Sequence, residues 1–340
     1  MNQNMKKAWV GFDGFTDRLT HVVADKDNNT CYPTISDFSG RIRAAAGISC
    51  DLELTDSRIC PGGNAPIMAQ AMGRLGIDVT LAAAVGEGKV SSAFQPWQTY
   101  CRMIPLGESA DTLALEFNDG KIMLADLSAL DSLTWEKVKA CYPPKQILSD
   151  ISGTDLIALT CWSLLPHGDA LFCSFRDEIL AHCGSENNNP VIFFDPADMS
   201  KHSKDSIRRY GSLVASFRSF GQVVLGLNLN EGLTMADAYD LKELDHTALF
   251  AALYQKNIAD VILIHPRNGC YVCDRNGVRW LEGDLVERPI VSTGGGDHFN
   301  AGFCAGVLSG LPIDEAVRQG MHVSHYFVKT GNSPMPEDIR

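Results

Sequence analysis

The residues with the clearest chemical meaning lie where an apolar run, Ile290–Thr293, ends in three glycines and an aspartate. The glycines Gly294–Gly296 precede Asp297, which opens a run of small residues that predicts a helix over 297–310. Glycines let the backbone approach a ligand, and the amino end of a helix attracts anions. A carboxylate would repel a bound phosphate, so Asp297 fits better as a base for a hydroxyl that attacks that phosphate. The alternative interpretation is an ordinary strand-to-helix turn that Asp297 caps.

A second glycine pair, Gly62 and Gly63, stands before Asn64 and a predicted amphipathic helix over 65–75. Such a pair allows a small molecule to contact the backbone at a helix start. An ordinary glycine turn before a helix is the alternative.

Two aspartates, Asp13 and Asp17, follow the first predicted strand, Lys7–Phe12. Carboxylates in such a loop can accept hydrogen bonds from the hydroxyls of a substrate. They could equally be solvated loop residues.

Two further groups follow later strands. Asn228 and Glu231 form an Asn-x-x-Glu pattern directly after an apolar run, and His265, Arg267 and Gly269 follow the next one. Because carboxyl ends of parallel strands meet at one edge of a sheet, all these groups can converge there.

The elements that must position these residues alternate between short apolar runs and longer amphipathic stretches, which is typical of a parallel sheet covered by helices. The predicted strands are 7–12, 78–85, 155–160, 191–195, 222–227 and 260–265. The predicted helices are 65–75, 168–183, 203–220, 247–257, 297–310 and 312–330.

Two regions interrupt this alternation. Residues 14–60 are polar without a strong helical period, and 113–124 alternates around Asn118-Asp119-Gly120 as a hairpin does. A second hairpin is expected over 271–281, around Asn276-Gly277. We expect antiparallel strands from about 14–60 and 105–126 to project from the main sheet as a small lid over a site.

These motifs, in this order, resemble the signatures of the ribokinase-like carbohydrate kinase family over about residues 6–336. The resemblance implies an α/β fold of three layers, α/β/α, with a mostly parallel central sheet and a small β-sheet lid, in one domain over 1–340. It also implies transfer of a phosphoryl group from ATP to a hydroxyl of a sugar or sugar-like substrate. In that family the glycine turn is the anion hole and the last aspartate is the base, roles that fall here to Gly294, Gly295, Gly296 and Asp297.

The same resemblance assigns the remaining groups. Asp17, with Asp13 as second choice, would bind the substrate together with Gly62, Gly63 and Asn64. Asn228 and Glu231 would organise Mg²⁺ and phosphate through water, as suits an ion that keeps much of its hydration shell. The nucleotide side would comprise His265, Arg267, Gly269, His322 and Gly331.

One position departs from the family pattern. Val291 stands where members usually have an aspartate that helps to bind a monovalent cation. A valine side chain has no oxygen to offer, so we expect weak or absent potassium activation.

Composition limits the alternatives. The 340 residues carry 29 Lys+Arg against 41 Asp+Glu, a net charge of −12, which disfavours nucleic-acid binding. No apolar run is long enough for a membrane span, and no signal peptide is expected. Eleven dispersed cysteines indicate reduced thiols and a cytoplasmic protein. By resemblance, a homodimer through the lid is expected.

Three rival functions remain at this stage. A nucleoside kinase of the same fold would need a base pocket in the lid, and a non-catalytic sugar or nucleotide sensor would tolerate the altered His265–Gly269 loop. A nicotinamide-dependent dehydrogenase is disfavoured because no Gly-x-Gly-x-x-Gly follows the first strand. The single Cys270-x-x-Cys273 pair is too little for zinc, and Gly86–Val90 lacks the spacing of a phosphate-binding Walker loop.

Overall fold

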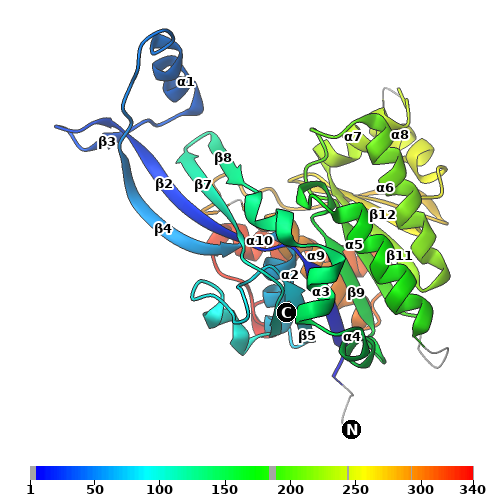
Figure 1. The fold of residues 1–340 in the computed structure, drawn as a ribbon. Helices are drawn as coiled ribbons and strands as arrows, with labels where there is room; N and C mark the ends of the chain where they lie inside the picture. Colours follow the sequence, from blue (N-terminus) through cyan, green and yellow to red (C-terminus); the bar gives the residue numbers. More distant parts are fainter. Residues whose placement is uncertain (1–4, 184–188, 243–244, 292, 340) are drawn as a thin grey trace.

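The computed structural model describes residues 5–183, 189–242, 245–291 and 293–339. Its larger sheet, from which a smaller sheet projects (Figure 1), has nine strands in the order β14-β13-β12-β11-β10-β9-β1-β5-β6. Strands β6 to β12 in that order run parallel, and β13 and β14 add an antiparallel edge. The bounds are β1 Lys7–Phe12, β5 Asp78–Ala83, β6 Arg102–Pro105, β9 Leu156–Thr160, β10 Val191–Asp195, β11 Gln222–Asn228, β12 Val261–His265, β13 Gly269–Asp274 and β14 Gly277–Glu282.

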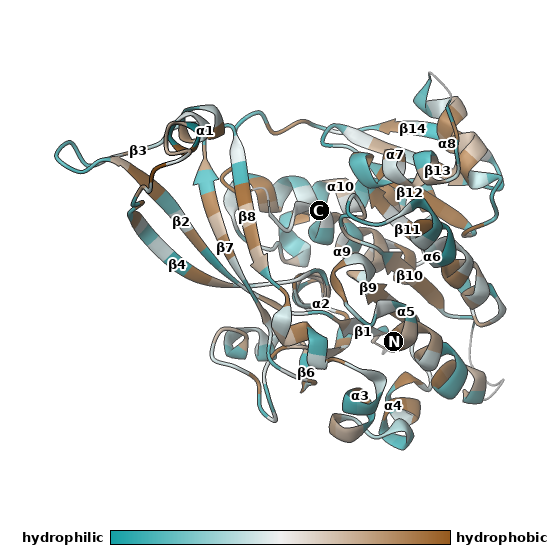
Figure 2. Cartoon of the chain, turned by 45° about the horizontal axis from the view of Figure 1, so that its top comes forward, coloured by the Kyte–Doolittle hydropathy of each residue, from teal (hydrophilic) through white to brown (hydrophobic). Residues whose placement is uncertain are grey.

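Helices cover both faces of this sheet, so the predicted three-layer α/β/α architecture is confirmed. Because neighbouring strand residues point to opposite faces, Trp9 and Val10 belong to two different cores. One face carries α2 Asn64–Arg74, α9 Gly295–Leu308 and α10 Ile313–Thr330. The other carries α3 Trp135–Cys141, α4 Pro144–Ile151, α5 Gly168–Ser174, α6 Lys204–Ser216, α7 Leu229–Ala238 and α8 His246–Tyr254. The strands between the layers are mostly hydrophobic, as buried parallel strands are (Figure 2).

A smaller five-stranded sheet projects from the larger one. It contains β2 Phe15–Asp25, β3 Thr30–Cys31, β4 Leu54–Gly62, β7 Ala110–Phe117 and β8 Gly120–Asp126 (Figure 1). The predicted hairpin over 113–124 is confirmed, because β7 and β8 pair antiparallel through Phe117 and Gly120. The expectation of antiparallel strands throughout is wrong at one place: β2 and β7 pair in parallel.

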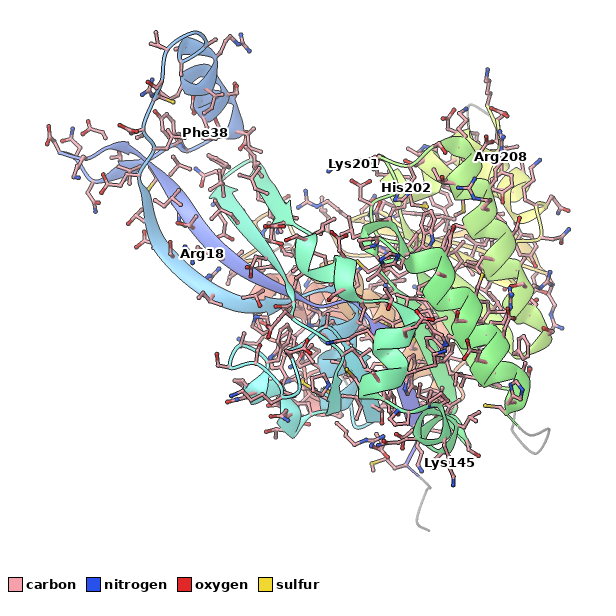
Figure 3. The ribbon with its side chains drawn as sticks, viewed as in Figure 1. Arg18, Phe38, Lys145, Lys201, His202 and Arg208 are labelled. Carbon is pink, nitrogen blue, oxygen red and sulfur yellow. The ribbon has the colours of Figure 1, made fainter. Side chains whose placement is uncertain are left out.

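The smaller sheet also carries a helix that the sequence did not predict, α1 Ile35–Ala44. Thr34 caps it by accepting a hydrogen bond from the Asp37 N–H, at 3.0 Å. Its sole buried residue is Phe38, which lies in the part of the smaller sheet far from the main sheet (Figure 3). The Phe38 ring packs between Tyr32 and Phe117 at centroid distances of 5.6 and 5.4 Å. A helix that buries one side chain leaves almost no helical period in its sequence, which explains the omission.

A second correction concerns the continuous helix predicted over 168–183. The α-helix ends at Ser174, and a π turn over Phe175–Ile179 and a 3₁₀ turn over Leu180–His182 follow. Phe175 and Ile179 remain fully buried in the core, so the apolar pattern persists although the helix type changes.

Candidate active site

The predicted site residues gather at the carboxyl ends of the parallel strands. Asp13 follows β1, Asn228 ends β11 and His265 ends β12, and Asp195, which was not predicted, ends β10 between them. In open α/β sheets, ligands bind at this edge.

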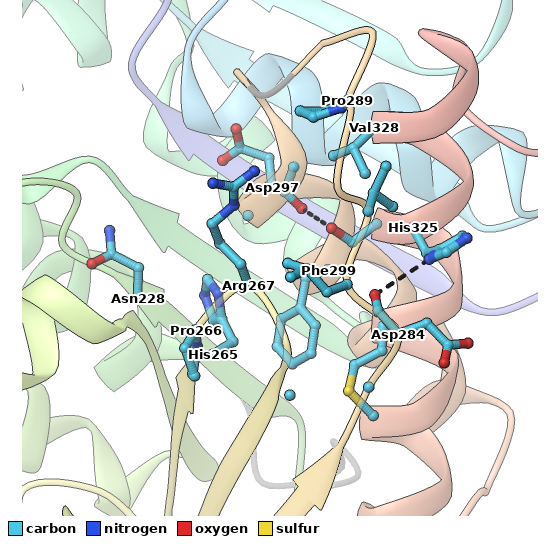
Figure 4. A pocket seen from close by; sticks show the side chains of 18 of the residues that line it. Asn228, His265, Pro266, Arg267, Asp284, Pro289, Asp297, Phe299, His325 and Val328 are labelled. Atoms are coloured by element: carbon cyan, nitrogen blue, oxygen red, sulfur yellow. Dashed lines mark hydrogen bonds between the residues drawn. The ribbon is translucent and has the colours of Figure 1, made fainter. Parts of the chain in front are cut away.

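The glycine bend directs the backbone into a pocket there. Gly294 adopts a left-handed conformation with φ 84°, which favours glycine, and α9 begins at Gly295. The Ser324 hydroxyl on α10 donates to the carbonyl of Gly295 at 2.8 Å and ties the bend to its neighbouring helix (Figure 4). The first N–H groups of a helix have no partner within it, so those at Gly295 and Gly296 can serve a ligand in the pocket that both residues line.

The pocket has a volume of about 360 Å³ and combines predicted and unpredicted residues. Asp297 and Arg267 both point into it, and His325 and Val328 of α10 stand on another side (Figure 4). The predicted site residues that line this pocket are Asn64, Asn228, Glu231, His265, Arg267, Gly269, Gly295, Gly296 and Asp297.

Asp297 shares this edge of the sheet with other carboxylates. Burial raises the pKa of Asp297 well above its usual value, and repulsion from Asp195, Asp13 and Glu231 raises it further. Strongly perturbed carboxyl pKa values of this kind cluster at functional sites.

Asp195 is the functional candidate that the sequence analysis missed. Asn300 Nδ2 donates to its Oδ2 at 2.7 Å, Asn64 Nδ2 donates to the same oxygen at 3.4 Å, and the Ala197 N–H donates to Oδ1 at 2.9 Å. Burial nevertheless raises the pKa of Asp195. The sequence feature that could have indicated Asp195 is its position as a polar residue at the end of a predicted strand.

Asp13 and Asp17 lie beside the glycine pair, outside the lining of this pocket. Asp13 is fully buried and accepts hydrogen bonds from the Ala65 N–H at 3.0 Å and the Thr160 hydroxyl at 2.8 Å. It therefore caps α2 from another element, although burial raises its pKa to about 6. Asp17, on β2, is 7% exposed and forms a side-chain hydrogen bond with Thr112.

The two glycines allow these carboxylates to approach the start of α2. A Cβ at Gly62 would collide with the carboxylate of Asp17. A Cβ at Gly63 would lie 2.7 Å from Asp13 Oδ2, and its φ of 96° also favours glycine.

Asn228 and Glu231 form a reciprocal capping box at the start of α7. Asn228 Oδ1 accepts from the Glu231 N–H at 2.9 Å, and Glu231 Oε2 accepts from the Asn228 N–H at 2.8 Å. Burial, followed by repulsion from Asp195, raises the pKa of Glu231 to about 8. The pattern thus has a structural role, while both residues also line the pocket.

The donor set suits Mg²⁺ held through water. Carboxylate and amide oxygens of Asp195, Asn228, Glu231 and Asp297 line one pocket, and mutual repulsion among the carboxylates favours a nearby cation. Within the described ranges, no three His, Cys, Asp or Glu side chains converge closely enough to hold a metal directly.

The far end of the pocket lacks two predicted nucleotide residues. His322 is exposed and Gly331 ends α10 outside the pocket, whereas His325, one helical turn after His322, lines it. The remaining wall was not predicted and comprises Pro266, Gly283, Asp284, Leu285, Val286, Pro289, Phe299, Met321, Ser324 and Val328.

Several solved structures with a similar fold are kinases. Ribokinase from Thermotoga maritima matches with a TM-score of 0.67 and 14% identity, covering 98% of both chains. A nucleoside kinase from Methanocaldococcus jannaschii matches with 0.66 and 13%, covering 98% of this chain and 97% of that one. A putative ribokinase II from E. coli, in complex with ATP and Mg²⁺, matches with 0.65 and 14%, covering 99% and 96%. The chain therefore has the ribokinase fold.

Sequence comparison identifies the family. A model of the prokaryotic ketohexokinase family matches residues 3–340, so the chain belongs to that family and is a carbohydrate kinase. A ketohexokinase from Haloferax volcanii is 24% identical over 335 residues, which are 97% of this chain and 88% of that protein.

In the described part of the chain, every helix is too short or too polar to cross a membrane. All eleven cysteines are free thiols.

Proposed function

We propose that this protein transfers the γ-phosphoryl group of ATP to a hydroxyl of a ketohexose. The single observation that carries the proposal is that Asp297 lines one pocket together with Gly295 and Gly296, the first residues of α9. This supports a base and an anion site side by side, as phosphoryl transfer requires.

In this mechanism the Asp297 carboxylate takes the proton of the substrate hydroxyl. The hydroxyl oxygen forms a bond to the γ-phosphorus while the bond from that phosphorus to the β-bridging oxygen breaks, and ADP leaves. The N–H groups of Gly295 and Gly296 stabilise the charge of the transferring group. Asn228 and Glu231 would hold Mg²⁺ through water, where it would offset charge on the phosphates.

The sugar would lie between the main sheet and the five-stranded sheet, which acts as the lid of a single domain. Asp17 would accept hydrogen bonds from its hydroxyls, next to Gly62, Gly63 and Asn64. Lys121 lowers the pKa of Asp17, yet burial outweighs it and the pKa is raised. The carboxylates of Asp17, Asp195 and Asp297 would repel an anionic substrate, so we expect neutral sugars to be preferred over sugar acids and sugar phosphates.

The test is a coupled ADP-release assay with D-fructose, D-ribose, fructose 6-phosphate, a sugar acid and adenosine as acceptors. We expect D-fructose to be the best acceptor, whereas a preference for adenosine would indicate a nucleoside kinase. Asp297→Asn should reduce kcat by about 10²–10⁴-fold. The exposed Asp78, at the opposite end of β5, provides the control variant Asp78→Asn. Full turnover in Asp297→Asn, or ATP binding without turnover on any acceptor, would contradict the proposal.

The lid also supports the expected homodimer. Large apolar side chains are exposed on its strands and on the segment around α1, and Ile48, Ile59 and Leu124 are exposed by 70, 63 and 54%. An exposed apolar group of this kind suits a second copy of the chain. Ile59→Glu should shift the mass in sedimentation from dimer to monomer, and an unchanged dimer would place the interface elsewhere. The free thiols favour the cytoplasm as the location.

A further inference from the structure

His298, the residue after Asp297, is buried behind the glycine bend with both ring nitrogens in hydrogen bonds. Its exposed fraction is 1%. Nδ1 lies 2.7 Å from the carbonyl oxygen of Gly294, and Nε2 lies 2.7 Å from the hydroxyl of Ser333. The ring also stacks on Phe327 of α10, with centroids 3.6 Å apart and planes 9° apart. Its orientation is therefore fixed from three sides.

The protons of this group can be assigned from its partners. A neutral imidazole carries one proton, and the hydrogen-bond partners decide which ring nitrogen holds it. A carbonyl can only accept, so Nδ1–H donates to Gly294 and Nε2 accepts from the Ser333 hydroxyl. Ser333 Oγ also lies 2.7 Å from Oε1 of Gln70 on α2. Because the single hydroxyl proton is used by Nε2, Gln70 satisfies the group when its amide is turned so that the NH₂ faces Ser333.

The bond to Gly294 determines where the next N–H points. The carbonyl of Gly294 and the N–H of Gly295 belong to one planar, trans peptide unit, so they point in opposite directions. Both the backbone N–H of His298, at 3.0 Å, and its ring Nδ1 bond to this carbonyl, and the ring adds the shorter bond that holds it on the protein side. The N–H of Gly295 is thereby directed to the opposite side, and Gly295 lines the pocket.

We propose that His298 is a positioning residue for phosphoryl transfer, which rests on the anion hole of the proposed function. It holds the Gly294–Gly295 peptide unit in the orientation that serves the transferring group. Through Ser333 and Gln70 it also links the bend to α2, the helix that begins at Asn64 on the substrate side. The imidazole itself touches no substrate.

Three substitutions at His298 distinguish the roles of the two ring nitrogens. His298→Ala removes both bonds, and kcat should fall about tenfold while KM for ATP and for sugar stays nearly constant. His298→Asn places an amide N–H where Nδ1 stands and should retain most of kcat. His298→Gln places its amide near Nε2 and should lose turnover as the alanine variant does. The opposite order for Asn and Gln would overturn the proposal, and that comparison holds even if His298→Ala fails to fold.

A second measurement distinguishes positioning from a merely structural role. ADP with aluminium fluoride mimics the transferring group, so it should inhibit His298→Ala less strongly than wild type, while inhibition by ADP alone is unchanged. Equal weakening of both inhibitors would overturn the proposal. If wild type shows no added inhibition by aluminium fluoride, or Asp297→Asn keeps its turnover, the proposed function fails instead.

Discussion

The carboxylate of Asp13 accepts a hydrogen bond from the backbone N–H of Ala65 at 3.0 Å, which joins the loop after β1 to the first turn of α2. Asp17, four residues further on, lies on β2 beside Gly62 and forms a side-chain hydrogen bond with Thr112. Two neighbouring aspartates are thus assigned different tasks by their partners: Asp13 organises a helix start, and Asp17 remains the candidate for the sugar.

Substitution of the two aspartates should therefore affect different measurements. Asp13→Ala leaves buried donors without an acceptor, so it should lower the free energy of unfolding by about 1–3 kcal/mol. Asp17→Ala should change stability less and raise KM for the sugar by about 10–100-fold. Urea denaturation and initial rates measure the two effects. Asp13→Asn, which keeps an acceptor oxygen, is the control, and a stability loss confined to Asp17→Ala would reverse the assignment.

The crowded carboxylates should make Asp297 costly for stability. The pKa of Asp297 is higher in the folded state than in the unfolded state, so the folded protein binds this proton more tightly. The contribution of Asp297 to the free energy of unfolding therefore decreases as pH rises from the unfolded-state pKa through the folded-state pKa. Asp297→Asn removes this titration together with its repulsion of Asp195 and Glu231. The variant should be more stable than wild type, by a margin that widens as pH rises above the usual carboxyl pKa of 3.8, although it turns over little substrate.

Differential scanning calorimetry at several pH values measures that margin. The comparison must be between variants, because His265 and His298, whose pKa values burial lowers to about 4, add stability as pH rises toward 6.5 in both proteins. Asp78→Asn should show a constant Tm difference from wild type. A constant difference for Asp297→Asn as well would show that Asp297 is not under electrostatic strain.

The glycine pair offers a test of the substrate side. Gly62→Ala would place a Cβ against the Asp17 carboxylate, so Asp17 must move and KM for the sugar should rise while KM for ATP stays constant. Gly40→Ala is a matched control. Gly40 lies in α1, the helix that the smaller sheet carries, and a Cβ added there would meet no atom within 4 Å. If both variants behave alike, the approach of Asp17 to Gly62 does not matter for binding.

The sequence predicted the central sheet and the bend because their signals are local. Buried parallel strands such as Val191–Asp195 are continuous apolar runs, and the Gly294–Gly296 bend requires glycine for its backbone. The parallel pairing of β2 with β7 depends on segments about 95 residues apart, as the register of Phe15 with Ala110 shows, so no local pattern could indicate it.

The nucleotide end of the site was harder to predict for a related reason. His322 and His325 are equivalent in sequence, and only the packing of α10 decides that His325 lines the pocket. Asp195 was missed because a single aspartate at the end of a strand forms no motif. Its hydrogen bonds from Asn64 and Asn300 come from two helices distant in sequence.

Potassium should have little effect on this enzyme. The Val291 side chain has no oxygen, whereas ribokinase-like kinases usually have an aspartate at this position. The neighbouring Ser292 lies outside the described residues. Rates in potassium chloride should equal those in sodium or choline chloride at the same ionic strength. A many-fold increase with potassium would mean that other oxygens form a cation site, and Val291→Asp should then increase the response further.

Arg267 should contribute to ATP binding through its charge. It is exposed on the loop after β12 and lines the pocket, and no carboxylate in the described part of the chain forms an ion pair with it. Its guanidinium is therefore available to phosphate oxygens, and a charge-assisted hydrogen bond of this kind is lost in Arg267→Ala, so KM for ATP should rise about 10–100-fold. Arg267→Lys should recover part of that loss, since a lysine keeps the charge without the planar fork. His322→Ala, an exposed change one turn from the pocket-lining His325, is the control. Equal KM values for ATP in wild type and Arg267→Ala would mean that Arg267 does not bind the phosphates, which the glycine bend and Mg²⁺ would then bind without it.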